Sequence, residues 1–352
     1  MKRRQLLQSG ATWFGAAALA GAGVPAPAHA ASRSLTVTSF GGTFQQAEHK
    51  EIVVPFEKAE NCRVSVVTAV STRVASMLLA ANGHPGLDVV DMNQAPMYIV
   101  KRHNLLQKLD LEKIPNAKRI YPIAIDKEGY WIGSFIATTG LAYNTEKLKT
   151  PPTSWLDLWK PEYKGHVALP DITQGAGYEF LVEIARLHGG SAKDIDPGFK
   201  AIKELSPSVV TYYKEPDAMS RLLTSGEAWL GPWYNDRFNQ LKHAGAPVGF
   251  VRPKEGAIAL IGALCVPVGA PDPDLAMRYI NFAIGARTQG AFDQDMGEAP
   301  TNRDVVLPPS MAASNMLPYG AKVVESLVAL DQETISAELP NWISRWEREI
   351  TG

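Results

Sequence analysis

The residues best suited to bind a small molecule directly follow an apolar, strand-like segment, 228–231. They are Trp233, Tyr234, Asp236 and Arg237. A few hydrogen-bonding and charged groups on an aromatic lining are typical of small-molecule sites. We therefore expect these four side chains to contact a solute, although aromatic residues also pack in cores and the two charged residues could form a surface pair.

A second candidate surface follows the first predicted strand, 35–40. Phe40 ends this strand, and a glycine pair leads into a helix that begins with Gly42 and Thr43. Free backbone N–H groups at a helix start can approach a ligand and favour negative charge. An ordinary strand-to-helix turn also uses glycine. Because open α/β sheets bind ligands beyond the carboxyl ends of their strands, we expect Phe40, Gly42 and Thr43 to face the solute.

Further polar side chains stand at the ends of predicted strands or at helix starts. Asn93 and Gln94 close the third strand, and Thr173 follows the strand that ends at Asp171. Arg73 begins the second helix and adds positive charge there. We include Arg73, Asn93, Gln94 and Thr173 in the predicted solute site, which contains no catalytic residue, metal ligand or cofactor.

Alternating strands and helices must position these residues. Strands at 35–40, 63–69 and 87–92, with helices at about 43–59 and 73–81, predict a parallel sheet flanked by helices. A strand at about 133–143 is expected to cross to a second lobe, and 258–267 to return. The predicted divisions are an export signal at 1–30, lobe one at 31–135 plus 258–305, lobe two at 136–257, and C-terminal helices packing on the lobes at 306–352.

The beginning of the chain predicts export. Basic residues 2–4 precede an apolar run at 10–24 and an Ala-His-Ala sequence, so we expect cleavage after Ala30. The arginine pair is similar to a twin-arginine signal, although Lys2 and Leu6 depart from that motif. The first cysteine is Cys62, and no later run approaches the roughly 20 apolar residues of a spanning helix. We expect a free, monomeric periplasmic protein without a membrane anchor.

Charge and size narrow the possible partners. Loss of residues 1–30 removes three basic residues and no acidic one, which leaves a net charge of about −4. Nucleic acid as a partner would require clustered lysines and arginines, so we exclude it. About 320 residues can bury a large core and form two lobes. Although the periplasm permits disulfides, we expect Cys62 and Cys265 to be buried free thiols.

Four ordered motifs indicate a family. Segment 154–165 reads SWLDLWKPEYKG, in which Ser154 can cap a short helix, two tryptophans lie four apart, and a proline stops the helix. The motifs PKEG at 253–256, YINF at 279–282 and GEAPTN at 297–302 follow. Together they resemble the periplasmic solute-binding proteins of ABC importers, in the family that includes the spermidine and putrescine binders.

This resemblance implies both a fold and a mechanism. The fold is the two-lobed α/β periplasmic-binding-protein fold of type II, in which each lobe is a mixed sheet flanked by helices and the ligand cleft lies between the lobes. The protein would capture a small-molecule solute by hinge closure and deliver it to an inner-membrane ABC permease. A sensory protein that docks to a chemoreceptor would share this fold.

The sequence departs from the polyamine binders at the expected ligand contacts. Most acids and tryptophans that would hold a polyamine are missing. On the return strand, for example, the expected contact positions are occupied by Leu260 and Gly262. Arg237 occupies a region where some relatives carry an acid. A small carboxylate, an amino acid or a phosphonate is therefore an alternative ligand class, while Asp236 and Glu298 keep an amine ligand possible.

A periplasmic enzyme exported by the twin-arginine route is the rival hypothesis. The seven histidines are dispersed without metal-ligand spacing. Segment 175–180 lacks the third glycine of a dinucleotide-binding motif, and no Gly-x-Ser-x-Gly nucleophile motif is present. The sequence favours a binding protein.

Overall fold

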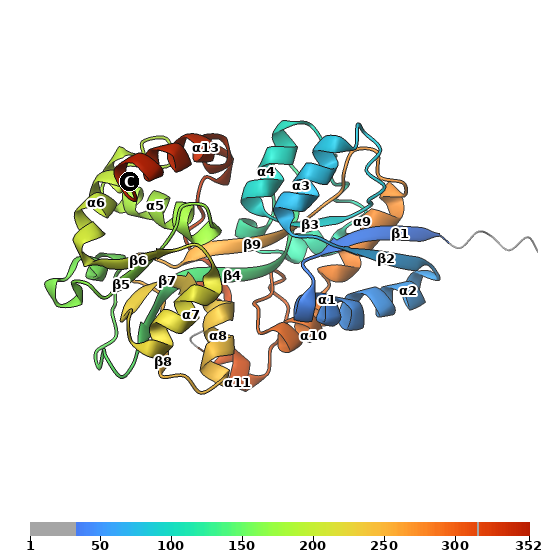
Figure 1. The fold of residues 1–352 in the computed structure, drawn as a ribbon. Helices are drawn as coiled ribbons and strands as arrows, with labels where there is room; N and C mark the ends of the chain where they lie inside the picture. Colours follow the sequence, from blue (N-terminus) through green and yellow to red (C-terminus); the bar gives the residue numbers. More distant parts are fainter. Residues whose placement is uncertain (1–32, 315–316) are drawn as a thin grey trace, which may run out of the picture. The chain divides into compact units, whose positions relative to one another are not determined.

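The computed structural model describes residues 33–314 and 317–352 (Figure 1). The predicted export signal lies outside these residues. The lobe boundaries stay a prediction. Buried apolar residues form two main clusters. The first draws its members from 35–132 and 261–292, and the second from 141–258 and 335–346. Among the described residues, no helix is long and apolar enough to cross a membrane.

Strands and helices alternate along the described chain. The strands are β1 Ser34–Ser39, β2 Arg63–Thr68, β3 Val90–Asn93, β4 Ile132–Asn144, β5 Val167–Pro170, β6 Val209–Tyr213, β7 Leu230–Tyr234, β8 Val248–Val251 and β9 Ile258–Cys265. The α-helices are α1 Gly42–Glu48, α2 Val54–Glu60, α3 Ser71–Ala80, α4 Gln94–Arg102, α5 Gly175–Leu187, α6 Asp196–Leu205, α7 Pro216–Ser225, α8 Asn235–His243, α9 Pro273–Ala283, α10 Ala286–Met296, α11 Pro309–Ala312, α12 Ala321–Val324 and α13 Gln332–Glu349. A π-helix, η1 His49–Val53, joins α1 to α2, and short 3₁₀ helices are η2 Pro115–Arg119, η3 Pro122–Ala124, η4 Trp155–Trp159, η5 Pro161–Tyr163 and η6 Ser206–Ser208.

Two long antiparallel strands connect the halves of the molecule. The first part of β4 pairs with β9, from Ile132 opposite Leu264 to Thr139 opposite Ile258. The second part of β4 pairs with β7 and β8, while the other edge of β9 pairs with β3. One seven-stranded sheet, in the order β3-β9-β4-β7-β5-β6 with β8 on β4, therefore runs through both predicted lobes. Both predicted crossing strands are present.

The first strands of lobe one form a parallel pair, as predicted. β1 pairs with β2, and an isolated parallel bridge joins Val37 of β1 to Val89, next to β3. The helical segment between β1 and β2 widens at η1, where the Val54 N–H donates to the His49 carbonyl. Pro55 follows directly and has no N–H to donate, which accounts for the irregular turn. This segment places Glu48 and Ile52 against the lobe-one core.

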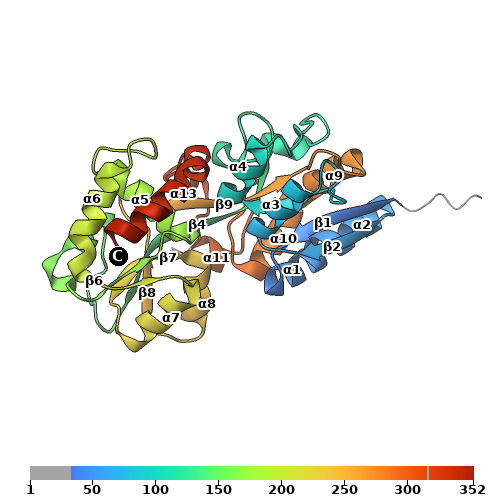
Figure 2. The ribbon, with the colours of Figure 1, turned by 45° about the horizontal axis from the view of Figure 1, so that its top comes forward.

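The C-terminal helix α13 contacts both halves of the molecule. Trp342 and Trp346 lie in the lobe-two core. At the other end of α13, the Arg102 guanidinium of α4 donates to the Ser336 hydroxyl at 2.9 Å and to the Ser336 carbonyl at 3.0 Å. α13 lies beside α4 in both views (Figures 1 and 2). It therefore links the lobe-two core to a lobe-one helix.

The tryptophan-rich segment forms a capped 3₁₀ helix, η4. The Ser154 hydroxyl accepts from Leu156 N–H, and Asp157 reaches back to the Ser154 N–H, which completes a capping box. Trp155 is fully buried, and its indole N–H donates to the Gly256 carbonyl at 2.9 Å. The motif at 154–165 is therefore tied to the motif at 253–256 by packing.

Both cysteines are free. Cys265 is buried as expected, whereas Cys62 is only partly buried. The expectation of a buried Cys62 is therefore wrong, because this residue lies in the turn between Asn61, which ends α2 in the left-handed conformation, and β2.

Replacing Trp155 by alanine should destabilise the protein by about 3–5 kcal/mol, because it leaves a cavity and an unpaired Gly256 carbonyl. The Leu156→Ala variant is the control, since Leu156 lies on the same short helix with 42% exposure. Urea unfolding followed by circular dichroism measures both. Equal losses would contradict the assignment of Trp155 to the core.

Candidate functional site

The site elements are the ends of β7 and β1, the start of α8, and the segment after α10. β7 ends at Tyr234, and α8 begins at Asn235. The buried Asn235 side chain accepts a 2.6 Å hydrogen bond from the Thr138 N–H in the middle of β4. This bond holds the first turn of α8, which carries Asp236 and Arg237, against the strand that crosses between the lobes.

Tyr234 ties the end of β7 to the start of α5. Its hydroxyl accepts from the Ala176 N–H at 2.8 Å. A Cβ atom on the adjacent Gly175 would lie 2.9 Å from this hydroxyl, so the close approach favours glycine there. Trp233 is fully buried instead, and its indole N–H donates to the Pro216 carbonyl at 3.1 Å. Trp233 therefore packs in lobe two behind Tyr234.

Asp236 and Arg237 lie at the N-terminal turn of α8. The Arg237 guanidinium is 3.8 Å from the Asp236 carboxylate and 3.9 Å from that of Asp217, and its side chain is 44% exposed. Both distances exceed an ordinary hydrogen bond, so neither carboxylate holds the guanidinium tightly. Burial raises the pKa of Asp236, and the Arg237 charge partly offsets this rise.

Glu298 connects these charges with lobe one. It follows α10, and its neighbour Ala299 forms backbone hydrogen bonds with Ile136 of β4. Glu298 is 5% exposed, and its Oε2 has no hydrogen-bond partner among the described residues. Burial raises its pKa well above the usual value, and the charges of Asp236 and Asp91 raise it further. The pKa of Glu298 is thus raised by acids of α8 and β3, and the Arg237 charge partly offsets this rise.

A cluster of phenylalanines includes the predicted residue Phe40. Its ring centroid lies 5.1 Å from that of Phe44 and 6.3 Å from that of Phe135, and Phe44 also meets Phe292 at 5.1 Å. Phe135 lies over Gly262, where a Cβ atom would come within 2.2 Å of the ring. The glycine on the return strand is therefore required to seat this aromatic side chain.

The other predicted residues lie on the surface or in turns. Gly42 begins α1 with a φ of 58°, in the left-handed region that favours glycine. Thr43 and Arg73 are exposed, and neither side chain forms a hydrogen bond or ion pair with any described residue. The Thr173 hydroxyl donates to Asp171 at 2.5 Å, which turns it back toward the end of β5.

Asn93 and Gln94 mark the junction of β3 and α4. Asn93 precedes the first helical residue, and its N–H donates to the Ser71 hydroxyl at 2.9 Å. The Asn93 side chain is exposed, and Gln94 is partly buried. The structure therefore brings Tyr234, Asp236 and Arg237 together at the junction of β7 and α8. It also places Phe40 in the aromatic cluster. It shows no comparable contact, among the described residues, for Thr43 or Arg73.

The side chains of this region are suited to binding a solute through charged groups and aromatic rings. The charges of Asp236 and Arg237 on α8 and of Asp91 on β3 all act on Glu298, and Phe44 and Phe135 pack against each other in the aromatic cluster. Among residues 33–314 and 317–352, no group of three or more His, Cys, Asp and Glu side chains could hold a metal ion. Sequence reasoning missed Phe44, Phe135 and Phe292 because their convergence depends on non-local pairing.

The chain belongs to the family of bacterial extracellular solute-binding proteins, whose family model matches residues 51–318. Proteins of this family bind solutes outside the cytoplasmic membrane, so the chain is a solute-binding protein. This confirms the class that the ordered motifs predicted.

Relatives and solved structures agree with this class. The chain is 27% identical over 259 residues, covering 70% of each chain, to spermidine/putrescine-binding periplasmic protein 1 of Haemophilus influenzae. It is 24% identical over 332 residues, covering 91% of this chain and 92% of the relative, to a gamma-aminobutyric acid-binding protein of Pseudomonas aeruginosa. The fold matches a putative extracellular solute-binding protein from Bordetella parapertussis at a TM-score of 0.81, with 24% identity and 90% and 98% coverage. The predicted periplasmic-binding-protein fold and periplasmic location are confirmed.

Replacing Asn235 by alanine should lower the free energy of unfolding by about 1–3 kcal/mol, because the buried Thr138 N–H loses its acceptor. The Gln240→Ala variant is the control, since Gln240 is exposed on the same helix. Chemical unfolding compares the two variants with the wild type. An Asn235→Ala protein as stable as the control would show that this bond does not anchor α8.

Proposed function

We propose that the protein captures a small zwitterionic solute, with an amine at one end and a carboxylate at the other, and delivers it to an inner-membrane ABC permease. Arg237 supplies the group for the carboxylate. Glu298 and Asp236 supply the groups for the amine, and the phenylalanine cluster provides an apolar wall. The predicted contacts Phe40, Gly42, Thr43, Arg73, Asn93, Gln94, Thr173, Trp233, Tyr234, Asp236 and Arg237 remain part of this proposal.

The observation that carries the proposal is the loosely held guanidinium beside a buried acid without a partner. Arg237 lies 3.8 Å from its nearer carboxylate, so it can pair with an incoming anion without first breaking a strong ion pair. Glu298 has an unused oxygen in a buried position, where a cationic amine would satisfy it. A solute with both charges meets both needs.

The relatives support a zwitterion over a polyamine. The gamma-aminobutyric acid-binding relative aligns with 91% of this chain, whereas the spermidine/putrescine-binding relative aligns with 70%. Gamma-aminobutyric acid carries one amine and one carboxylate, and putrescine carries two amines. Only the first would use Arg237 as a binding group.

Ligand binding acts by population shift in this proposal. A solute that contacts residues of both lobes favours the closed arrangement by the difference in its affinity for the two states. The permease would then recognise the closed, loaded protein. The protein works as a monomer, because one chain carries all the proposed contacts.

We expect gamma-aminobutyric acid to raise the melting temperature of the mature protein more than putrescine or succinate does, because a ligand that binds only the folded state stabilises it. Thermal shift and titration calorimetry measure this. A larger response to putrescine would indicate a polyamine receptor, and a larger response to succinate would favour an anion receptor. No response to any of the three would reject the proposed ligand class.

Two charge-removing variants test the roles of the binding groups. Arg237→Gln and Glu298→Gln should each weaken binding of gamma-aminobutyric acid about tenfold or more, which corresponds to the loss of one charged hydrogen bond. Arg221→Gln and Glu325→Gln are the controls, because both residues are exposed. If the site variants bind as tightly as the controls, the solute lies elsewhere.

A further inference from the structure

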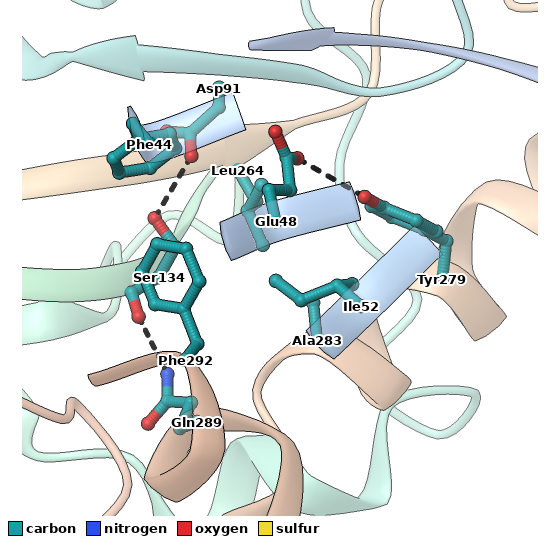
Figure 3. A pocket seen from close by; sticks show the side chains of 10 residues that line it. All are labelled: Phe44, Glu48, Ile52, Asp91, Ser134, Leu264, Tyr279, Ala283, Gln289 and Phe292. Atoms are coloured by element: carbon teal, nitrogen blue, oxygen red, sulfur yellow. Dashed lines mark hydrogen bonds between the residues drawn. The ribbon is translucent and has the colours of Figure 1, made fainter. Parts of the chain in front are cut away.

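A small cavity next to the phenylalanine cluster is lined by residues of predicted lobe one (Figure 3). Its volume is about 20 Å³, which is room for one water molecule. Phe44 of this cluster lines the cavity, as do two acidic side chains, Glu48 and Asp91, together with Ser134 and Tyr279. The remaining lining residues are Ile52, Leu264, Ala283, Gln289 and Phe292.

Each acid has one bonded oxygen and one unbonded oxygen. Glu48 is 4% exposed, and its Oε1 accepts from the Tyr279 hydroxyl at 3.2 Å. Asp91 is 3% exposed, and its Oδ2 accepts from the Ser134 hydroxyl at 3.2 Å. Glu48 Oε2 and Asp91 Oδ1 have no partner among the described residues. Two buried carboxyl groups therefore each present an unsatisfied oxygen, a strongly unfavourable state for an anion.

No cationic side chain in the described part of the chain neutralises this pair. Neither carboxyl group forms a salt bridge with a lysine or arginine in the described part of the chain. The titratable groups that face Glu48 and Asp91 from neighbouring elements are Tyr279 of α9, Cys265 of β9 and Glu298. These groups are neutral or acidic, so none of them stabilises two negative charges.

The surroundings also argue against a metal ion. Calcium takes six to eight oxygen ligands, and magnesium requires six in an octahedron. The cavity offers two free carboxyl oxygens and a wall composed mainly of carbon atoms from Phe44, Ile52 and Leu264. A proton neutralises a carboxyl group without further ligands, and a water molecule can satisfy both unpaired oxygens.

We propose that Glu48 and Asp91 form a buried binding site for protons and one bridging water molecule, which together fasten α1 and η1 to β3. When the pair holds one proton, the protonated carboxyl group donates to the water and the water donates to the ionised one; at lower pH the second carboxyl group is protonated as well. This arrangement gives every polar atom at the cavity a hydrogen-bond partner.

The titration of the pair follows from its surroundings. Burial raises the pKa of Glu48 to about 7. Burial, and next the charge of Glu48, raise the pKa of Asp91 to about 8. Both values exceed those of an unfolded chain, so the folded protein binds more protons than the unfolded one between about pH 4 and pH 8. The stabilising effect of the pair is present at low pH and is lost as the pH rises through 8.

The double variant Glu48→Gln/Asp91→Asn tests the site, because amides keep the shape and cannot release these protons. Melting temperatures are measured at pH 5 and pH 8.5. The decrease between the two should be smaller in the variant than in the wild type by about 3 °C or more. The matched control is Glu204→Gln/Asp194→Asn, which makes the same changes at exposed positions of lobe two. Equal decreases in all three proteins would overturn the proposal.

A crystal structure of the wild-type protein at about pH 6 and high resolution supplies a second test that does not depend on the variant folding. The expected result is one water molecule within hydrogen-bond distance of both Glu48 and Asp91. A metal ion in the cavity, or an empty cavity with the carboxyl groups turned away from each other, would overturn the proposal. Neither experiment requires the solute, so the proposed ligand class can fail without affecting this inference.

Discussion

The antiparallel pairing of β4 with β9 is the interaction on which the rest of the structure depends. β9 uses one edge for β3 and the other for β4, and β4 continues past β9 to pair with β7 and β8. The strands of both predicted lobes are therefore joined through these two segments of backbone. Asn235 hydrogen-bonds to the same strand, so the start of α8 follows any movement of β4. A hinge closure between the lobes has to be accommodated by twisting of these strands.

Buried acids are the second constraint. Glu48, Asp91, Glu179, Asp293 and Glu298 are each 5% exposed or less. Their pKa values are raised, chiefly by burial, so ionisation of these groups is unfavourable without a partner. Strongly perturbed carboxyl groups cluster more often at binding sites than in purely structural positions. Here one member, Glu298, interacts with charges on α8 and with Asp91, whereas Glu48 and Asp91 line the small cavity next to Phe44.

The sequence predicted the strands and helices better than it predicted which side chains contact one another. The crossing strand expected at 133–143 is β4, Ile132–Asn144, because this stretch carries no charged residue and suits a strand buried along almost its whole length. The convergence of Phe40, Phe44 and Phe135 depends on which strands pair, which a single sequence does not specify. The position of Trp233 could have been anticipated, since successive strand residues point to opposite faces and Tyr234 already faces α5.

The departure from the polyamine pattern has a steric basis. Gly262 is one of the two residues of the return strand at which the sequence departs from the polyamine pattern, and the space above it is filled by the Phe135 ring. A carboxylate side chain at 262 would overlap that ring, so aromatic packing and a charged group exclude each other at this position. Charge recognition then has to come from residues outside the aromatic cluster, and the acids and the guanidinium near Glu298 are the groups that remain. Glycine at 262 therefore makes room for the Phe135 ring in the aromatic wall and leaves no side chain of its own to hold a charged solute.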